Sequence, residues 1–339
     1  MKSNPLVLLI GVLLLACGGG AAATIPPTSG ADGGTVVLYS GRTEELVGPL
    51  LSRFEEETGL ETDVRYGSSP EMAATILTEG TDSPADLFYS QDPASLGSVA
   101  DLMEPLPESL LGLAPERFSD PDGRWVGVTA RSRVLAFNPE LVAEADLPAS
   151  YRELTEPEWS GRFGIAPTNG SFVTFISAMI LLEGEEATGR WLEGIAANDP
   201  VTFDGNSPIA AAVDAGDLEL GLINHYYLRE LGAEQGSITA QNHFFTEPDA
   251  GSLVMPSGIG ILSTASNPEG AEALIEFLLS SESQAYFAET NFEYPVIADA
   301  PAPEGLPAID TLVSPVLSSA DLAGVLDQAT DLIAAAGLS

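Results

Sequence analysis

The folded part of the sequence opens with Thr35-Val36-Val37-Leu38-Tyr39-Ser40, a short run of β-branched and apolar residues. It is followed by Gly41-Arg42-Thr43 and then by residues 44–57, whose apolar side chains share one helical face while acidic residues cover the other. Gly59 stands where the C-terminal cap of a helix belongs. We therefore predict a strand, a turn and a helix at the start of the fold.

The same alternation continues as far as residue 92. Leu60–Tyr66 and Ala85–Tyr89 have the composition of strands, and Met72–Glu79 has that of a helix. Strand and helix in alternation predict an α/β fold with a parallel sheet, in which ligands bind beyond the C-terminal ends of the strands. Those ends carry Ser40-Gly41-Arg42, Ser68-Ser69 and Ser90-Gln91-Asp92.

A second alternation occupies the middle of the chain. We predict strands at 133–137, 163–166 and 220–223, and helices at 148–155, 171–183 and 185–196. A strand at 257–262 and helices at 268–279 and 281–287 come after a long excursion. A chain that starts one lobe, builds a second and returns to the first places its ligand in the cleft between them.

The first residues are typical of an export signal. Residues 1–16 combine Lys2 with an apolar run that is shorter than the ~20 residues a membrane helix needs. Leu14-Leu15-Ala16-Cys17 resembles the lipobox of bacterial lipoproteins, which would make Cys17 the lipidated first residue of the mature chain. The alternative is an ordinary signal that is cleaved after Ala21-Ala22-Ala23. Residues 17–34 are then the anchor and a flexible tether.

Composition excludes several classes of function. The formal net charge is −38, which argues against nucleic acid because the phosphates would be repelled. Cys17 is the only cysteine, so the mature fold has neither a disulfide nor a thiolate metal ligand. We find no nucleophile elbow, Walker loop, zinc-protease helix or dinucleotide-binding glycine motif, and we expect no enzymatic activity.

Seven landmarks in consecutive order give the chain a family resemblance. They are Leu38-Tyr39-Ser40-Gly41-Arg42, residues 83–92, Arg131-Ser132-Arg133-Val134, Pro157-Glu158-Trp159-Ser160-Gly161, residues 167–172, Asn224-His225-Tyr226-Tyr227 and Glu293-Tyr294-Pro295. Across residues 35–335 the chain resembles the periplasmic ferric-ion-binding proteins of ATP-binding-cassette (ABC) transporters, a branch of the type II periplasmic binding fold.

The resemblance implies two lobes joined by crossover strands near residues 130–136 and 254–262, with iron in the central cleft. We expect lobe 1 to comprise 35–132 and about 257–307, and lobe 2 to comprise 133–256 and about 308–339. It also implies delivery to the permease and ATPase of an iron importer by a monomer. The lipid anchor would hold that monomer on a membrane, at a periplasmic or an extracellular face.

Tyr226 and Tyr227 are the iron ligands that the resemblance implies, together with carbonate or phosphate as a synergistic anion. Their chemistry agrees, because Fe³⁺ is a hard ion that prefers anionic oxygen to imidazole or thiolate. A free tyrosine has a pKa near ~10, so the metal must displace two protons and binding should weaken as pH falls. Adjacent residues of a strand point to opposite sides, so a turn is needed after the strand at 220–223.

Three family ligand positions are altered in this sequence. Thr43 replaces a histidine, Gln91 stands where several members use an acid, and Phe172 replaces a tyrosine. Two side-chain ligands leave an octahedral ion with about four more donors to find. We expect the anion and water to supply them.

The resemblance also carries over candidates for the anion site, namely Asn169, Gly170, Ser171, Asn206 and Asn224. Asn169 to Ser171 would offer backbone N–H groups at the start of a helix, where negative charge is favoured.

Arg42, Arg133 and Asp92 complete the predicted anion site. Arg42 either contacts the anion or is a solvated or lobe-bridging arginine. Arg133, with Arg131 nearby, would add positive charge. Asp92 either belongs to the surroundings of the anion or caps a helix.

The remaining histidines and tyrosines receive lesser roles. We expect His225 and His243 to be structural and Tyr294 to pack within a lobe, and we hold Tyr39 as the best reserve ligand, ahead of Tyr66 and Tyr89. One alternative function stays open, a binding protein for another small anion or an organic solute against which the tyrosines only pack.

Overall fold

The computed structural model describes residues 34–298 and 300–338, so the predicted signal sequence and Cys17 lie outside the described residues. The strands are β1 Thr35–Ser40, β2 Glu61–Tyr66, β3 Leu87–Ser90, β4 Val126–Phe137, β5 Phe163–Ile165, β6 Val201–Thr202, β7 Leu220–Asn224, β8 Gln241–His243, β9 Val254–Ile261 and β10 Tyr294–Pro295. The helices are α1 Glu44–Thr58, α2 Ser69–Glu79, α3 Pro93–Val99, α4 Glu108–Leu111, α5 Gly170–Glu183, α6 Glu185–Ala197, α7 Asn206–Asp214, α8 Tyr227–Gln235, α9 Pro268–Leu278, α10 Ser281–Thr290, α11 Ser319–Gly324 and α12 Leu326–Ala335.

The sheet confirms the predicted α/β class. Within the described residues, the strands run in the order β2-β1-β3-β9-β4-β7-β5-β6, and β8 and β10 pair with β4. The first three strands are parallel, as their alternation with helices predicts, whereas β9 is antiparallel to β3. Gly59 caps α1 with a left-handed φ of 75°, which explains why this helix ends where the sequence predicts.

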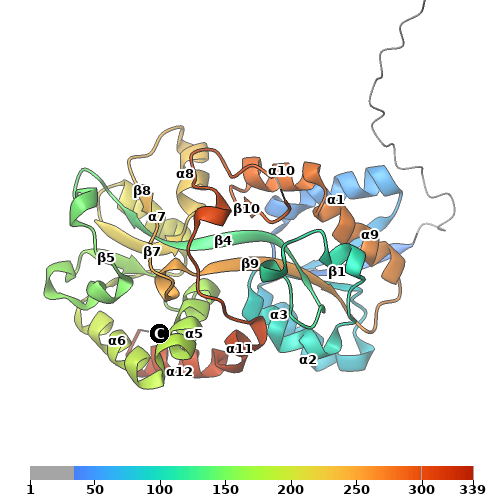
Figure 1. The fold of residues 1–339 in the computed structure, drawn as a ribbon, viewed down its shortest axis with the longest axis horizontal. Helices are drawn as coiled ribbons and strands as arrows, with labels where there is room; N and C mark the ends of the chain where they lie inside the picture. The colour runs from blue at the N-terminus through green and yellow to red at the C-terminus, as the bar shows by residue number, and fades with distance from the viewer. Residues whose placement is uncertain (1–33, 299, 339) are drawn as a thin grey trace, which may run out of the picture. The chain divides into compact units, whose positions relative to one another are not determined.

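One long strand joins the two halves of the sheet. All twelve residues of β4 are buried, and its first part, Val126–Ser132, pairs with β9. Its second part, Arg133–Phe137, pairs with β7 instead. Figure 1 shows β4 and β9 lying side by side across the middle, with β1 toward one end of the sheet and β5 and β7 toward the other. The partner exchange occurs between Ser132 and Arg133.

The buried apolar side chains group on either side of this exchange. Two clusters draw on residues 36–130 and 259–296, and include Leu38, Phe54 and Leu274. Two others draw mainly on residues 134–255 and 322–338, and include Phe163 and Leu192. This grouping supports a division into two lobes. The boundaries of the lobes stay a prediction.

The predicted helix at 148–155 is wrong. The segment forms only a short 3₁₀ turn, Tyr151–Thr155, in which the Ser150 hydroxyl accepts from the backbone N–H of Arg152. Glu156 precedes a proline and has an extended ψ of 143°, and this restriction stops the turn from growing into a helix.

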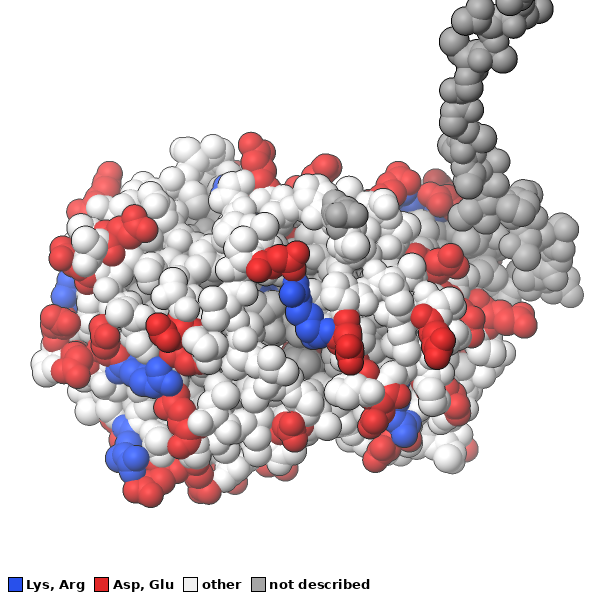
Figure 2. All heavy atoms as spheres, viewed as in Figure 1, with Lys and Arg blue, Asp and Glu red and all other residues white. Residues whose placement is uncertain are grey.

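The surface is acidic throughout the view in Figure 2, where red carboxylate side chains are spread over the whole face and blue side chains are few. No helix within residues 34–298 and 300–338 is long and apolar enough to cross a membrane.

Candidate metal and anion site

The two tyrosines lie where β7 turns into α8. Tyr226 precedes the helix with helical φ and ψ of −74° and −23°, and Tyr227 is the first helical residue. The predicted turn is therefore present, and the rings stack with their centroids 4.2 Å apart and their planes at 30°. Both phenols consequently lie on the same side of the chain, which an extended strand would not allow.

Tyr226 is almost wholly buried, with 4% of its surface exposed. Burial raises the pKa of Tyr226 well above its ordinary value, and Tyr227 adds to this shift. Arg131 and Arg42 act in the opposite direction because a positive charge stabilises the phenolate. Without a cation the phenol therefore keeps its proton, although two arginines are already placed to favour its loss.

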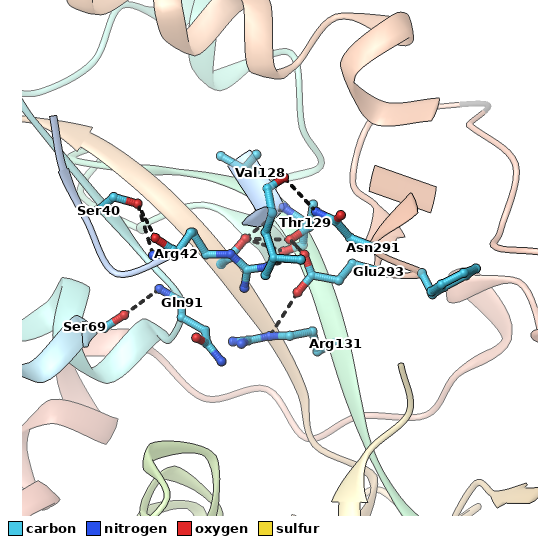
Figure 3. Close-up of polar contacts among 12 residues, drawn as sticks. Ser40, Arg42, Ser69, Gln91, Val128, Thr129, Arg131, Asn291 and Glu293 are labelled. Carbon is cyan, nitrogen blue, oxygen red and sulfur yellow. Dashed lines mark hydrogen bonds and ion pairs between the residues drawn. The ribbon is translucent and has the colours of Figure 1, made fainter. Parts of the chain in front are cut away.

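Arg42, Arg131 and Glu293 form a buried group (Figure 3), and each of them acts electrostatically on Tyr226. A guanidinium nitrogen of Arg42 donates to Glu293 Oε2 at 2.9 Å, and the Thr129 hydroxyl donates to the same oxygen at 2.9 Å. The Nε of Arg131 lies 3.9 Å from Glu293 Oε1, too far for a hydrogen bond. The exposed fractions of the three side chains are 1%, 1% and 0%, so the pairing is shielded from water.

Positive charge exceeds negative charge in this group. All three nitrogens of Arg131 and two of Arg42 have no hydrogen-bond partner among the described residues. Unpaired buried charge is costly, because a guanidinium removed from water needs both a counter-charge and acceptors for its N–H groups. The arrangement is therefore suited to hold an anion against Arg131.

Arg133 lies in a second, separate group. It donates to Ser171 Oγ at 3.1 Å, to Asn224 Oδ1 at 3.3 Å and to the carbonyl of Leu222 at 3.2 Å. Burial lowers the pKa of Arg133 to about 10, and Tyr227 and Tyr226 oppose this shift. Arg133 thus adds positive charge near the tyrosines, but most of its N–H groups are held by the protein.

Asn169 and its neighbours are brought together as the sequence predicts, with one difference. Asn169 Oδ1 accepts from the backbone N–H of Ser171 at 3.0 Å, from the Ser171 hydroxyl at 2.7 Å and from Asn206 at 3.3 Å. The Ser171 N–H that was expected to face an anion is therefore occupied by this cap. An added Cβ at Gly170 would meet nothing within 4 Å, and the buried Asn224 Nδ2 has no partner among the described residues.

Comparison with known proteins identifies the family. The model of the bacterial extracellular solute-binding proteins matches residues 81–312, more than half of the chain. The chain belongs to this family. This solute-binding protein is 32% identical to the Fe(3+)-binding periplasmic protein of Serratia marcescens, over 94% of this chain and 93% of the relative. It is 30% identical to the major ferric iron-binding protein of Neisseria meningitidis serogroup B, over 89% and 93% of the two chains.

Solved structures agree with these relatives. The crystal structure of iron-bound HitA from Pseudomonas aeruginosa is 34% identical, with a TM-score of 0.84 over 90% of this chain and 99% of that one. A Trichodesmium protein in complex with iron and citrate is 27% identical, with a TM-score of 0.78 over 90% and 100% of the two chains. These neighbours confirm the predicted type II periplasmic binding fold.

Thr43, Gln91 and Phe172 occupy the altered family positions in this solute-binding protein. Thr43 is exposed and caps nothing with its side chain. Phe172 is buried in the core, 5.8 Å from the ring of Phe175. Gln91 donates its backbone N–H to Ser69 Oγ at 2.8 Å, and its side chain extends toward Arg131 in Figure 3.

Asp92 has the capping role, which is one of its two predicted roles. Its Oδ1 accepts from the backbone N–H of Ser95 at 2.8 Å and its Oδ2 accepts from the Ser95 hydroxyl at 2.9 Å, so it caps α3. Burial raises the pKa of Asp92, while the Ser95 bonds and Arg131 act to lower it. The solvated alternative for Arg42 is wrong, because that side chain is buried against Glu293.

His225 has the structural role expected of it. Its Nδ1 accepts from the backbone N–H of Ser132 at 3.1 Å, and its Nε2 lies 3.0 Å from the carbonyl of Phe292. These partners require a neutral ring with the proton on Nε2. Burial lowers the pKa of His225 to about 3, and the two backbone contacts only partly offset this shift.

We predict an acid-sensitive contribution of His225 to stability. The folded pKa is about 3 and the unfolded pKa is near 6.5, so between these values the unfolded chain binds a proton that the folded chain refuses. Stability should therefore be lost as pH falls from about 6.5 toward about 3. Urea unfolding of iron-free protein at pH 7.5 and pH 5 should show a smaller decline for His225→Gln than for the wild type. An equal decline would contradict this prediction.

The other tyrosines have partners or surroundings of their own. The Tyr39 hydroxyl donates to Glu79 at 3.1 Å, so its role as the reserve ligand stays a prediction, and Tyr66 is half-buried on β2. Tyr89 is fully buried, and its hydroxyl has no partner among the described residues. Burial raises the pKa of Tyr89 to about 12, and Glu293 adds to the rise, whereas Arg42 acts to lower it. Tyr294 packs on His225 at 4.6 Å, and His243 lies on β8 against Phe245.

The sequence analysis does not predict Arg131 and Glu293 as members of the site. It names Arg131 only as a neighbour of Arg133, and Glu293 only as part of a family landmark. A signal for Arg131 was present, because Thr129, Arg131 and Arg133 alternate along one strand and so share a face. No comparable signal links Glu293 to Arg42, which is 251 residues away in the chain.

Proposed function

We propose that this solute-binding protein captures ferric iron for an ABC importer and binds the ion through Tyr226 and Tyr227. The observation that carries the proposal is a stacked tyrosine pair near the buried Arg131, whose side-chain nitrogens have no partner in the described part of the chain. The named ferric-iron-binding relatives and the iron-bound neighbour support the same conclusion.

The donor set suits Fe³⁺ better than softer metals. No group of three or more His, Cys, Asp or Glu side chains within residues 34–298 and 300–338 is placed to hold a metal ion. Phenolate oxygens remain, and they favour a hard trivalent ion. Binding then releases the phenolic protons, since each ligand must be deprotonated to coordinate.

We further propose that the synergistic anion binds mainly to Arg131 rather than to Arg133. Arg131 has three unpaired nitrogens, whereas Arg133 already donates to three protein oxygens. The anion would supply oxygen donors to iron and also neutralise the surplus positive charge of the Arg42–Arg131–Glu293 group. Carbonate and phosphate are both suited to this role because each offers several oxygens to a guanidinium.

The test is an iron titration with carbonate, with phosphate and with neither, followed by absorption. We expect one ferric ion per chain and a visible band from phenolate-to-iron charge transfer, with tighter binding when an anion is present. Iron-loaded protein without such a band would overturn the assignment of the tyrosines.

Iron affinity should fall steeply with pH. Below the pKa values of both phenols, each proton displaced costs about tenfold in affinity per pH unit, so two protons give up to about 100-fold. Glu230 adds to this trend. Burial raises the pKa of Glu230 to about 7, and Glu293 contributes to the rise. Protonation of Glu230 below that pH removes a negative charge that attracts the cation. Competition titrations with citrate between pH 6 and pH 8 measure the slope. A flat profile would contradict the requirement for phenolate.

Export and anchoring complete the proposal. We propose that residues 1–16 are removed, that Cys17 carries the lipid, and that the protein acts as a monomer with the permease and ATPase of the importer. The lipid and the tether would keep the binding domain close to the membrane on its outer side. Metabolic labelling with a tritiated fatty acid would test this, since Cys17→Ser should remove the label.

One observation favours the second function, a binding protein for an organic or inorganic anion without iron. The buried N–H groups of Arg42 and Arg131 would bind an anion whether or not metal is present. Calorimetry of metal-free protein with phosphate, carbonate and citrate distinguishes the two functions. Tight anion binding that iron does not strengthen would favour this second function.

A further inference from the structure

His225 directly precedes the tyrosine pair, and its side chain is fully buried. Its main chain and its ring both contact Ser132 on β4. The His225 N–H donates to the carbonyl of Ser132 at 3.0 Å, and the Ser132 N–H donates to the ring Nδ1 at 3.1 Å. One residue of the crossing strand is therefore held twice by the residue that precedes the tyrosines.

The ring of His225 takes the place of a main-chain acceptor at this turn. In a continued antiparallel pair, His225 and Ser132 would exchange two main-chain hydrogen bonds. The carbonyl of His225 instead accepts from Asn242 Nδ2 at 2.7 Å, because β7 ends at Asn224 and the chain turns into α8. The ring nitrogen thus completes the pairing of Ser132 at the point where the strand stops.

The second ring nitrogen of His225 contacts a different segment. Its Nε2 lies 3.0 Å from the carbonyl of Phe292, to which the neutral ring donates. The ring also packs on Tyr294 with the centroids 4.6 Å apart. It meets the ring of Tyr226 edge-on, with the centroids 5.9 Å apart and the planes at 81°. The orientation of the imidazole is therefore fixed on several sides.

The two hydrogen-bond partners of the ring adjoin the charged residues of the site. Ser132 directly follows Arg131, and Phe292 directly precedes Glu293. One imidazole therefore connects the main chain of both charged segments to the residue that begins the turn with the tyrosines.

The first turn of α8 lacks the side-chain cap that would otherwise hold it. Tyr226 occupies the N-cap position, and its side chain makes no capping bond. Ser, Thr, Asp or Asn usually occupy this position, because their side chains accept from the first free N–H groups of the helix. The contacts of His225 therefore hold the start of this helix, and metal binding requires ligands whose geometry is held by surrounding contacts.

We propose that His225 is a positioning residue, which holds the turn with the tyrosine pair against the segments with Arg131 and Glu293. The inference rests on the proposed function, because the geometry that the ring maintains is that of the iron ligands. The ring acts through the tyrosines rather than as a ligand. Residues that orient a metal ligand typically contribute about 10- to 100-fold to metal affinity.

Three substitutions separate the two ring contacts. The amide of Asn ends at the position of Nδ1, so His225→Asn keeps an acceptor for the Ser132 N–H and loses the bond to Phe292. The longer amide of Gln ends at the position of Nε2, so His225→Gln does the reverse. His225→Phe keeps a ring against Tyr294 and loses both bonds. Iron affinity should fall at least about tenfold in His225→Phe, and each amide variant should recover at least about threefold of this loss.

A double-mutant cycle distinguishes positioning from a general loss of stability. In a Tyr226→Phe background, His225→Phe should weaken iron binding by no more than about threefold, because the ligand next to the ring is already missing. The matched control is His243→Phe, which replaces the other histidine of the chain, half-buried on β8, and should leave iron affinity within about twofold. Equal losses in the two backgrounds, or equal losses in the two histidine variants, would overturn the proposal.

An iron-free measurement covers a failure of His225→Phe to fold or of the proposed function itself. In metal-free protein, the Ser132 amide should exchange its hydrogen slowly in the wild type and in His225→Asn, and at least about tenfold faster in His225→Gln. Equal exchange in all three proteins would overturn the proposal, because the ring would then not hold Ser132. Wild-type protein that binds no iron would refute the proposed function alone, and the exchange rates would still decide whether the ring fixes the turn.

Discussion

Tyr226→Phe should lower the affinity for ferric iron by at least about 100-fold. Loss of a residue that only contacts a metal ligand costs up to about 100-fold, and loss of the ligand itself should cost at least as much. The variant removes a single oxygen and keeps the ring that stacks on Tyr227 at 4.2 Å. Because the ring and its stacking are kept, the fold should be unaffected. Iron titration against a competing chelator measures the loss, and the charge-transfer band should weaken in parallel.

A matched control for this variant is Tyr286→Phe. Tyr286 is a half-buried tyrosine of the helix α10 whose ring centroid lies 6.1 Å from that of Phe287, and it packs against the cluster that contains Leu38 and Phe54. Its substitution should leave both iron affinity and absorption unchanged. Unchanged iron affinity in Tyr226→Phe, with the thermal unfolding midpoint also unchanged, would remove the tyrosine pair from the site.

Arg131→Leu should abolish most of the dependence of iron binding on the anion. Hydrogen bonds to charged groups contribute about 1.5–3 kcal/mol each, so the loss of even one bond to the anion should weaken iron binding about 10- to 100-fold when the anion is present. Without added anion the wild type and the variant should differ much less. Iron titrations with and without carbonate or phosphate give the four affinities that are needed.

The same variant should not destabilise the iron-free protein through lost hydrogen bonds. None of the three guanidinium nitrogens of Arg131 has a partner within the described residues, and Glu293 keeps its bonds from Arg42 and Thr129. Replacement of a poorly paired buried charge by an apolar side chain is often neutral or stabilising. Arg65→Leu, at a half-exposed position of β2, is the control and should leave the dependence on the anion intact. An unaltered anion dependence in Arg131→Leu would place the anion elsewhere.

Much of the fold could be predicted because periodicity and caps act locally. The strand at residues 35–40, the helix that ends at Gly59 and the strand before Tyr226 are each specified by residues within one short window. The failure at residues 148–155 arose from a proline at its far end, which restricts the residue before it. Helices such as α7 and α8 are short and rich in small or charged residues, so their apolar faces are too narrow to detect from pattern alone.

Only the site residues that lie within the family landmarks could be predicted from the sequence. Tyr226 and Tyr227 were found together with the turn they require, and Asn169, Ser171 and Asn206 were placed in one cluster. The roles of the arginines could not be assigned, because Arg131 and Arg133 differ only in what surrounds them after folding. Arg133 meets a serine, an asparagine and a carbonyl, whereas Arg131 meets a carboxylate that is 162 positions further along the sequence.

The exchange of partners along β4 has a mechanical consequence for transport. Arg131 lies on the part of the strand that pairs with β9, and Arg133 lies on the part that pairs with β7. A bend of the strand between them would change the spacing of the two guanidinium groups by the same movement that parts the lobes. The positive charges that stabilise the phenolates would then move apart as the cleft opens. Release of the cargo would need no separate trigger, because Arg131 and Arg133 lie on the strand that bends.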